Sequence, residues 1–132
     1  MNGVNDLDLG AVSLTVPRLP EYLRLVRLAA AESGARAELS IEDIEDLRIA
    51  VDELTYALIG EDENEHTADA TITLRYSVAP GRVEIEGTGA ASGEPMQVSE
   101  LSRTIIGAVV DEYELAEVAG VRRFRLVKRS PT

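Results

Sequence analysis

Hydrophobic positions recur with different periods along the chain, and each period predicts one kind of element. Val12, Leu14 and Val16 alternate with polar residues, which predicts a short, half-buried strand. Apolar residues at steps of three and four then predict two amphipathic helices, from Pro20 to Gly34 and from Ser40 to Gly60. Proline favours the first turn of a helix, serine favours the position before it, and glycine favours its end.

The second half of the chain predicts two hairpins on either side of a third helix. A polar, acidic loop over residues 61–69 leads into apolar alternation at residues 72–85, where a central Pro-Gly turn is typical of a β-hairpin. Residues 87–93 contain three glycines and are predicted to be flexible. A serine-capped helix follows at residues 99–109, and a second hairpin bends at residues 118–121.

The predicted order of elements is β-α-α-β-β-α-β-β. Two hairpins and a lone strand can form one sheet, and amphipathic helices can bury their apolar stripes on one of its faces. We therefore expect an α+β fold, a two-layer α/β sandwich with a mixed, mostly antiparallel sheet and three helices on one face. Residues 11–130 are predicted to form this single domain, and residues 1–10 a flexible leader.

The charge balance restricts the kinds of partner without naming one. The chain has 24 acidic and 13 basic residues, for a net charge of −11. A phosphate backbone or an anionic membrane would repel such a surface, so direct contact with nucleic acid or membrane is not expected. A basic protein would be attracted, although high charge also serves solubility alone. The chain has no cysteine, no apolar run of membrane-spanning length and no signal-peptide pattern, and a cytoplasmic location is predicted.

Residues with the potential for chemistry are few. His66 is the only histidine and lies in the acidic loop, without the ligand spacing of a zinc or calcium site or the partners of a catalytic triad. On the second helix, Asp46, Glu53 and Ala57 fall together on one flank of the apolar stripe. A carboxylate at the edge of a core can act as a general base, and it can equally be a solvated acid.

The second helix carries a more specific signal. Residues 44–59 read IEDLRIAVDELTYALI, which resembles the N-box helix, approximately D-x-x-x-A-V-x-E-x-x-x-N-A, of the GHKL ATPase/kinase superfamily in its anti-sigma factor and serine-kinase branch. Residues 105–114 and 120–128 resemble two later segments of the same family. The resemblance runs from Val12 to Lys128 and implies the GHKL (Bergerat) ATPase-like fold, which agrees with the element order.

The catalytic and metal positions of that family carry over unequally. The family's general base, the N-box glutamate that activates water or a protein hydroxyl, falls on Glu53. The family's asparagine, which holds Mg²⁺, falls on Ala57, whose methyl group cannot ligate a metal. The resemblance therefore implies a vestigial base without its metal ligand.

The nucleotide-binding glycines carry over in part. The adenine-reading aspartate of the family falls on Gly87, or on Glu86 if the alignment is shifted by one, and the first glycine of its box falls on Gly89. The later phosphate-cradling glycines fall near Glu100 and Ser102, where an acidic side chain would repel phosphate. These departures predict a degenerate nucleotide site, with ATP and Mg²⁺ as cofactors only if the site still works.

The resemblance implies a function through protein partners. The chain is expected to be an anti-sigma factor that sequesters an alternative sigma factor of the general-stress or sporulation type and is released by a STAS-domain anti-anti-sigma factor. An active serine/threonine kinase that phosphorylates its STAS antagonist, and a nucleotide-independent adaptor, are the alternatives. A homodimer is expected, and Arg24 and Arg27 on the first helix are the candidate partner-binding residues.

Overall fold

The computed structural model describes residues 10–60, 67–91 and 95–131. Nearly all of the leader predicted for residues 1–10, and His66, lie outside the described residues. In chain order the elements are β1 (Ala11–Arg18), the short 3-10 helix η2 (Pro20–Tyr22), α1 (Leu23–Arg36), α2 (Ile41–Ile59), β2 (Thr67–Ala79), β3 (Arg82–Ala90), α3 (Glu100–Val109), β4 (Glu112–Val118) and β5 (Val121–Arg129).

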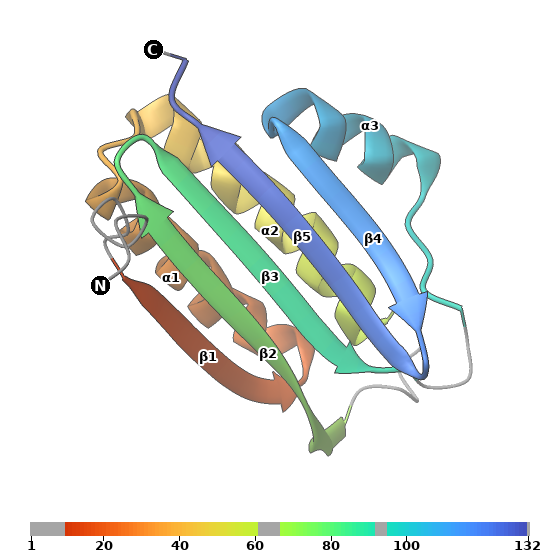
Figure 1. Cartoon of the computed structure of the whole chain (residues 1–132). Coiled ribbons are helices and arrows are strands. Elements are labelled where there is room, and N and C mark those ends of the chain that lie inside the picture. The colour runs from red at the N-terminus through yellow and green to blue at the C-terminus, as the bar shows by residue number, and fades with distance from the viewer. Residues whose placement is uncertain (1–9, 61–66, 92–94, 132) are drawn as a thin grey trace.

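The five strands form one sheet with the helices packed behind it (Figure 1). The strand order is β1-β2-β3-β5-β4, and every pair of neighbouring strands is antiparallel. Helices α1 and α2 lie across the back of the sheet, while α3 packs beside α2 near the β4 edge. The predicted α+β two-layer sandwich is confirmed, and its sheet is antiparallel throughout the described strands. Among the described helices, none has the length and apolar content that a bilayer span requires.

Helix α2 is the central element of the core, and its ends are those predicted from the sequence. The Ser40 hydroxyl caps it by accepting a hydrogen bond from the Asp43 backbone N–H at 3.0 Å. Gly60 ends it with a φ of 93°, a conformation that glycine adopts without a steric penalty. Its inward side is fully covered by the sheet and the neighbouring helices, and the buried residues include Leu47, Ala50, Val51, Leu54, Leu58 and Ile59.

The end of α1 differs from the prediction. The helix continues past Gly34 to Arg36, and the chain reverses at Glu38, which has a φ of 62°. A Cβ atom at position 34 would lie 2.8 Å from Cγ1 of Ile44 on α2. This glycine therefore allows α1 and α2 to approach closely, and it is a packing position in the helix rather than its stop signal.

The two hairpins form as predicted, but the first is longer. Its turn is at Pro80-Gly81, and the second hairpin turns at Ala119 and Gly120, whose φ angles of 53° and 78° suit a two-residue turn. Strand β2 begins at Thr67, inside the predicted loop, and β3 continues to Ala90 through part of the segment predicted to be flexible. Pairing with strands on both sides holds this glycine-containing segment extended.

Tyr76 joins the sheet to α1 through a buried hydroxyl group. Its side chain, on β2, is fully buried, and its Oη donates a hydrogen bond to the carbonyl oxygen of Val26 at 3.0 Å. Burial raises the pKa of Tyr76 well above its ordinary value near 10, because the phenolate would lose its hydration. The protonated side chain is therefore part of the folded state.

We expect Tyr76 to make the fold sensitive to alkali. Because the pKa is higher in the folded state, the neutral tyrosine stabilises the fold below the unfolded-state pKa of about 10, and this contribution is lost as the pH rises toward the folded-state pKa. Tyr76→Phe should lower the free energy of unfolding by about 1 kcal/mol at neutral pH. Its deficit relative to wild type should shrink above about pH 10.

Denaturant unfolding of both proteins between about pH 7 and pH 11 measures this deficit. Tyr56→Phe, which removes an exposed hydroxyl from α2, is the matched control. A deficit that stays constant across the whole pH range would contradict the assignment of the effect to Tyr76.

Candidate functional site

The flank of α2 that faces α3 holds the predicted general base. Oε1 of Glu53 accepts a hydrogen bond from the hydroxyl of Ser102 at 2.5 Å. Ser102 lies in the first turn of α3, where its backbone N–H donates to the hydroxyl of the capping residue Ser99 at 3.0 Å. The structure thus brings together the predicted general base, Glu53, and one predicted phosphate-cradling position, Ser102, and a hydrogen bond joins their side chains.

Ala57 and Asp46, the other two predicted positions on this flank, are surrounded or bonded by residues of the same chain. Ala57, one turn beyond Glu53, is 5% exposed, and its methyl group offers no lone pair to a cation. Nearer the start of α2, Asp46 accepts from Nζ of Lys128 at 3.3 Å, and Lys128 also donates to the carbonyl oxygen of Val109 at 2.8 Å. Within the described part of the chain, no three acidic or histidine side chains are arranged to hold a metal ion.

Gly87 and Gly89 face the helices from β3, and both are tightly surrounded. A Cβ atom at position 87 would lie 2.4 Å from Cε2 of Phe124 and 2.9 Å from Cδ1 of Leu58. At position 89 it would lie 3.0 Å from Cγ2 of Ile72. Core packing therefore fully explains why position 87 is a glycine, and it explains the glycine at position 89 in part.

Glu86 has the opposite orientation to its neighbour Gly87. Successive residues of a strand point to opposite faces of the sheet, and Gly87 points toward α2. Glu86 lines a shallow depression on the face that carries no helix, together with Glu114 and Arg123. The shifted alignment would therefore place the adenine-reading carboxylate on the far side of the sheet from Glu53.

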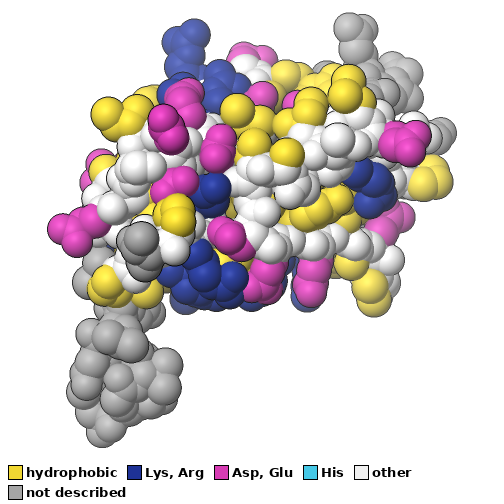
Figure 2. Space-filling view, turned by 90° about the horizontal axis from the view of Figure 1, so that it is seen from above, with side chains coloured by type: hydrophobic (Ala, Val, Ile, Leu, Met, Phe, Trp, Pro, Cys, Tyr) yellow, Lys and Arg dark blue, Asp and Glu magenta, His cyan; other side chains and the backbone are white. Residues whose placement is uncertain are grey.

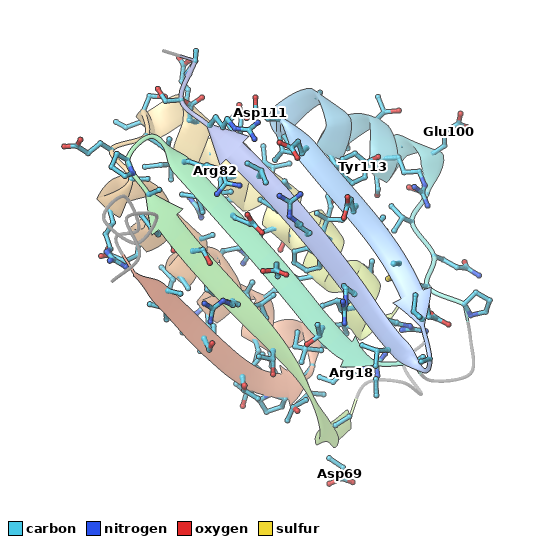
Figure 3. All side chains as sticks on the ribbon, in the orientation of Figure 1. Arg18, Asp69, Arg82, Glu100, Asp111 and Tyr113 are labelled. Atoms are coloured by element: carbon cyan, nitrogen blue, oxygen red, sulfur yellow. The ribbon has the colours of Figure 1, made fainter. Side chains whose placement is uncertain are left out.

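Two buried arginines hold the carboxyl end of α2, and the sequence analysis did not identify them. Arg18, at the end of β1, is 2% exposed and donates to the carbonyl oxygens of Leu58 at 2.9 Å, Ile59 at 3.2 Å and Ala90 at 2.7 Å (Figure 3). Arg122, on β5, is 1% exposed and donates to the carbonyl oxygen of Leu58 at 3.4 Å.

These arginines satisfy a general requirement of helices. The last carbonyl groups of a helix have no partner inside it and carry partial negative charge, so a cation placed there is stabilising. Arg122 also forms an ion pair with Glu117 at 3.4 Å. The alternation of each strand could have indicated that these arginines are buried. Arg18 lies two residues after the inward-facing Val16, and Arg122 lies two residues before the inward-facing Phe124.

The predicted partner-binding arginines lie on the outer side of α1 and differ in their surroundings. Arg24 is exposed, and its side chain forms no hydrogen bond or ion pair with the described residues. Arg27 is partly buried, and its Nη1 lies 2.6 Å from Oδ1 of Asp52 on α2. A shallow groove between the two helices is lined by Arg27, Glu45, Arg48, Ile49 and Asp52. Leu28, beside this groove on α1, is 59% exposed.

The net negative charge does not form a uniform surface. On the face seen in Figure 2, acidic, basic and hydrophobic side chains are interspersed. The groove between α1 and α2 holds two arginine–carboxylate pairs, Arg27 with Asp52 and Arg48 with Glu45. The exposed side chains of Arg24 and Leu28 also lie on the outer side of α1.

Comparisons with known proteins identify a family and several relatives. The family described as histidine kinase-like ATPase domain matches residues 16–120. The serine-protein kinase RsbW of Listeria monocytogenes is 37% identical over 79 residues, a match that covers 56% of this chain and 46% of the relative. RsbW of Bacillus pumilus is 33% identical over 86 residues, covering 64% of this chain and 51% of the relative. The chain thus spans about half the length of these curated relatives.

A solved structure has the same fold. The crystal structure of the RsbU and RsbW domains of a Mycobacterium tuberculosis protein aligns with a TM-score of 0.71. The alignment covers 91% of this chain and 32% of that one, with 18% sequence identity. At this level of identity the likeness establishes the fold alone.

The packing around Gly87 leads to a stability prediction. Gly87→Ala should lower the free energy of unfolding by about 1–3 kcal/mol, because the added methyl group would overlap with Phe124 and Leu58. Gly107→Ala on α3 is the matched control, since its Cβ would meet only Cε1 of Tyr113 at 4.0 Å, and alanine favours a helix by up to about 1 kcal/mol. Thermal and denaturant unfolding measure both changes. If Gly87→Ala is as stable as wild type, packing is not the reason for this glycine.

Proposed function

The chain belongs to the family of histidine kinase-like ATPase domains, and we propose that within it the chain is an anti-sigma factor with a degenerate nucleotide site. Its task would be to sequester an alternative sigma factor of the general-stress or sporulation type in the cytoplasm. A STAS-domain anti-anti-sigma factor would compete for the same surface and release the sigma factor. The similarity to RsbW relatives supports this family of roles.

The observation that carries the proposal is the set of side-chain contacts along the flank of α2 that faces α3. The position of the family's metal ligand is the buried Ala57, and the retained acid, Glu53, is hydrogen-bonded to Ser102 of the same chain. Beyond Ala57, the end of α2 is held by the guanidinium groups of Arg18 and Arg122. These contacts favour a role in which the helix layer binds proteins and does not transfer phosphate.

The outer side of α1 is the proposed partner surface. Arg24 has its guanidinium free of the described residues, and Leu28 beside it is exposed. An arginine next to apolar contact area is typical of residues that dominate binding energy, because its planar fork can hold a partner carboxylate through two hydrogen bonds. A sigma factor and a STAS antagonist that both used this surface would exclude each other.

An active serine/threonine kinase is the second candidate, and one observation favours it. The family's general base is retained as Glu53, and a serine hydroxyl is 2.5 Å from its carboxylate. The similar Listeria protein is described as a serine-protein kinase. A kinase would need ATP and Mg²⁺, so nucleotide binding distinguishes the two candidates.

We expect no useful binding of Mg-ATP. Calorimetric titration of the chain with ATP and Mg²⁺, with a Listeria RsbW as positive control, tests this directly. A dissociation constant in the low micromolar range, which corresponds to about −8 kcal/mol, would favour the kinase instead. A thermal shift of the chain on addition of Mg-ATP would lead to the same conclusion, because a ligand that binds only the folded state raises its stability.

We expect Arg24→Ala to weaken binding of the sigma factor by on the order of 2 kcal/mol, or roughly thirtyfold in Kd, with no change in melting temperature. Arg27→Ala should weaken binding and also remove the ion pair with Asp52, a partly exposed contact worth at most about 1 kcal/mol of stability. The sigma factor is first identified by co-purification from native extract, and each variant is then titrated against the purified protein.

Arg103→Ala is the control, since Arg103 is an exposed arginine on α3, away from α1. It should bind the sigma factor like wild type. A folded Arg24→Ala/Arg27→Ala double variant with wild-type affinity would show that this surface assignment is wrong.

A further inference from the structure

The two edges of the sheet differ in charge. β1 and β4 are the edge strands, and each pairs with only one neighbour (Figure 1). On β4, Glu112, Glu114 and Glu117 place negative charges along the edge, an arrangement that discourages pairing with another chain. On β1, residues 11–17 carry no charge, although 28% of the residues in the chain are charged. The β1 edge therefore has no charged side chain that would oppose an added strand.

The register shows which backbone groups of β1 are free. The N–H of Val78 on β2 donates to the carbonyl oxygen of Gly10 at 3.2 Å, just before β1 begins. In an antiparallel pair every second residue bonds to the neighbouring strand, so Ala11, Ser13 and Thr15 turn their N–H and C=O groups away from β2. No other described residue bonds to these groups. Each of the three residues thus offers one donor and one acceptor to an extended chain.

Apolar side chains are exposed beside this edge, on the side that faces the helices. Val12 lies opposite the fully buried Tyr76, yet it is 49% exposed, because α1 packs mainly on β2 and β3. Leu25 on α1 is 44% exposed. It lies about 200° around the helix from Arg27, which faces α2, and is therefore on the β1 side of α1. An added strand would cover part of this apolar surface.

The free edge is short. Pro17 has no N–H group, and its carbonyl oxygen already accepts a hydrogen bond from the N–H of Leu19 at 2.8 Å. The register with β2 also shifts between Pro17 and Arg18. At the other end, Gly10 has a φ of 107°, so the extended strand begins after it. Pairing with a new strand is therefore limited to residues 11–15.

We propose that the edge of β1 is a docking site for an extended segment of a protein partner, which joins the sheet as an additional antiparallel strand. Residues of the segment opposite Ala11, Ser13 and Thr15 exchange backbone hydrogen bonds with them and turn their side chains to the open face. The residues between them face Leu25 and are apolar. Because the chain carries a net charge of −11, basic residues on either side of this core favour association.

Size and charge favour a short segment over a second copy of the chain at this edge. In a stable interface between folded proteins, each partner contributes roughly 20–30 residues. The free edge is confined to residues 11–15, with Leu25 beside it. Two copies would also bring together two net charges of −11. A short extended segment needs less area, because main-chain hydrogen bonds supply its affinity.

A synthetic peptide tests the proposal without the natural partner. Its core is TVTVT, flanked by lysines, so that the threonines fall opposite Ala11, Ser13 and Thr15 and the valines face α1. Fluorescence anisotropy with a labelled peptide should give a dissociation constant below about 1 mM. Replacing the flanking lysines by glutamates should weaken binding, and the difference should be largest at low salt.

Methylation of the peptide backbone is the sharpest test of the register. A methyl group on the nitrogen of the central threonine removes a donor that faces β1, and it should weaken binding by about tenfold or more. The same methyl group on the nitrogen of a valine points away from β1 and should leave binding unchanged. Only strand addition in this register predicts a difference between the two peptides.

Variants of the chain give the complementary test. Ser13→Pro removes an N–H that faces the free edge, so the bonds to β2 remain, but peptide binding should fall by about tenfold or more. Leu25→Ser should also weaken binding. Leu101→Ser, which changes a 70% exposed leucine on α3, is the matched control and should bind like wild type. Circular dichroism melting shows whether each variant folds, and the methylated peptides decide if Ser13→Pro does not.

Hydrogen exchange of the wild-type chain gives an independent measurement. Saturating peptide should slow exchange at the amides of Ala11, Ser13 and Thr15, which are free of bonds to described residues without it. The amides of Gly107 and Ala108 on α3, away from β1, should exchange at the same rate with and without peptide.

Four results would overturn the inference. They are a lysine-flanked peptide that does not bind, methylated peptides that both bind like the unmodified one, a folded Ser13→Pro variant with wild-type affinity, and a wild-type dimer in sedimentation that Ser13→Pro dissociates. The last would mean that a second copy occupies the edge. The inference goes beyond the proposed function, and none of these assays contains a sigma factor. Failure of one is therefore distinguishable from failure of the other.

Discussion

The contact between Arg18 and the carboxyl end of α2 is the constraint on which the rest of the helix layer depends. A single guanidinium group bonds to two carbonyls of the central helix and to the end of β3, with almost no exposure to solvent. Burying an arginine is costly unless its donors are satisfied, and buried carbonyls are costly unless they are bonded. The arginine donors and the carbonyl acceptors satisfy one another. The end of α2 and the end of β3 are therefore held at a fixed separation.

That fixed distance affects the chemistry of the neighbouring flank. Ala57, the residue just before the first of these carbonyls, is enclosed, and one turn earlier Glu53 meets Ser102 of α3. On this flank side chains of the protein therefore contact one another, and the proposed role in protein recognition rests on these contacts.

The sequence predicted the architecture well because the relevant signals are local. Ser40 and Gly60 delimit α2 through their own backbone preferences, and the hairpin turns follow from Pro80-Gly81 and Gly120. The errors concern residues whose reason is an interaction distant in sequence. Gly34 resembles a stop signal, but contact with another helix determines its place.

In the candidate site, too, local sequence signals were predictive and contacts between residues distant in sequence were not. The N-box pattern could be read from α2 alone, and the family match agrees with that reading. The bond between Glu53 and Ser102 joins residues 49 positions apart, and it depends on how α3 packs against α2. Arg18 and Arg122 are still harder to anticipate, because an arginine at the end of a strand is usually exposed. Only the assembled sheet shows which helix end is close enough to receive them.

The strand order has a consequence for how the chain is made. β5, the last of the described strands in chain order, lies inside the sheet between β3 and β4, and it carries Arg122, Phe124 and Leu126 into the core. During synthesis, β3 has no partner on one side and β4 has none on either until β5 has left the ribosome. Domains generally fold as units as they emerge. Here the nascent chain cannot close its core until β5 has been translated, so its apolar strands stay exposed, and within reach of chaperones, up to that point.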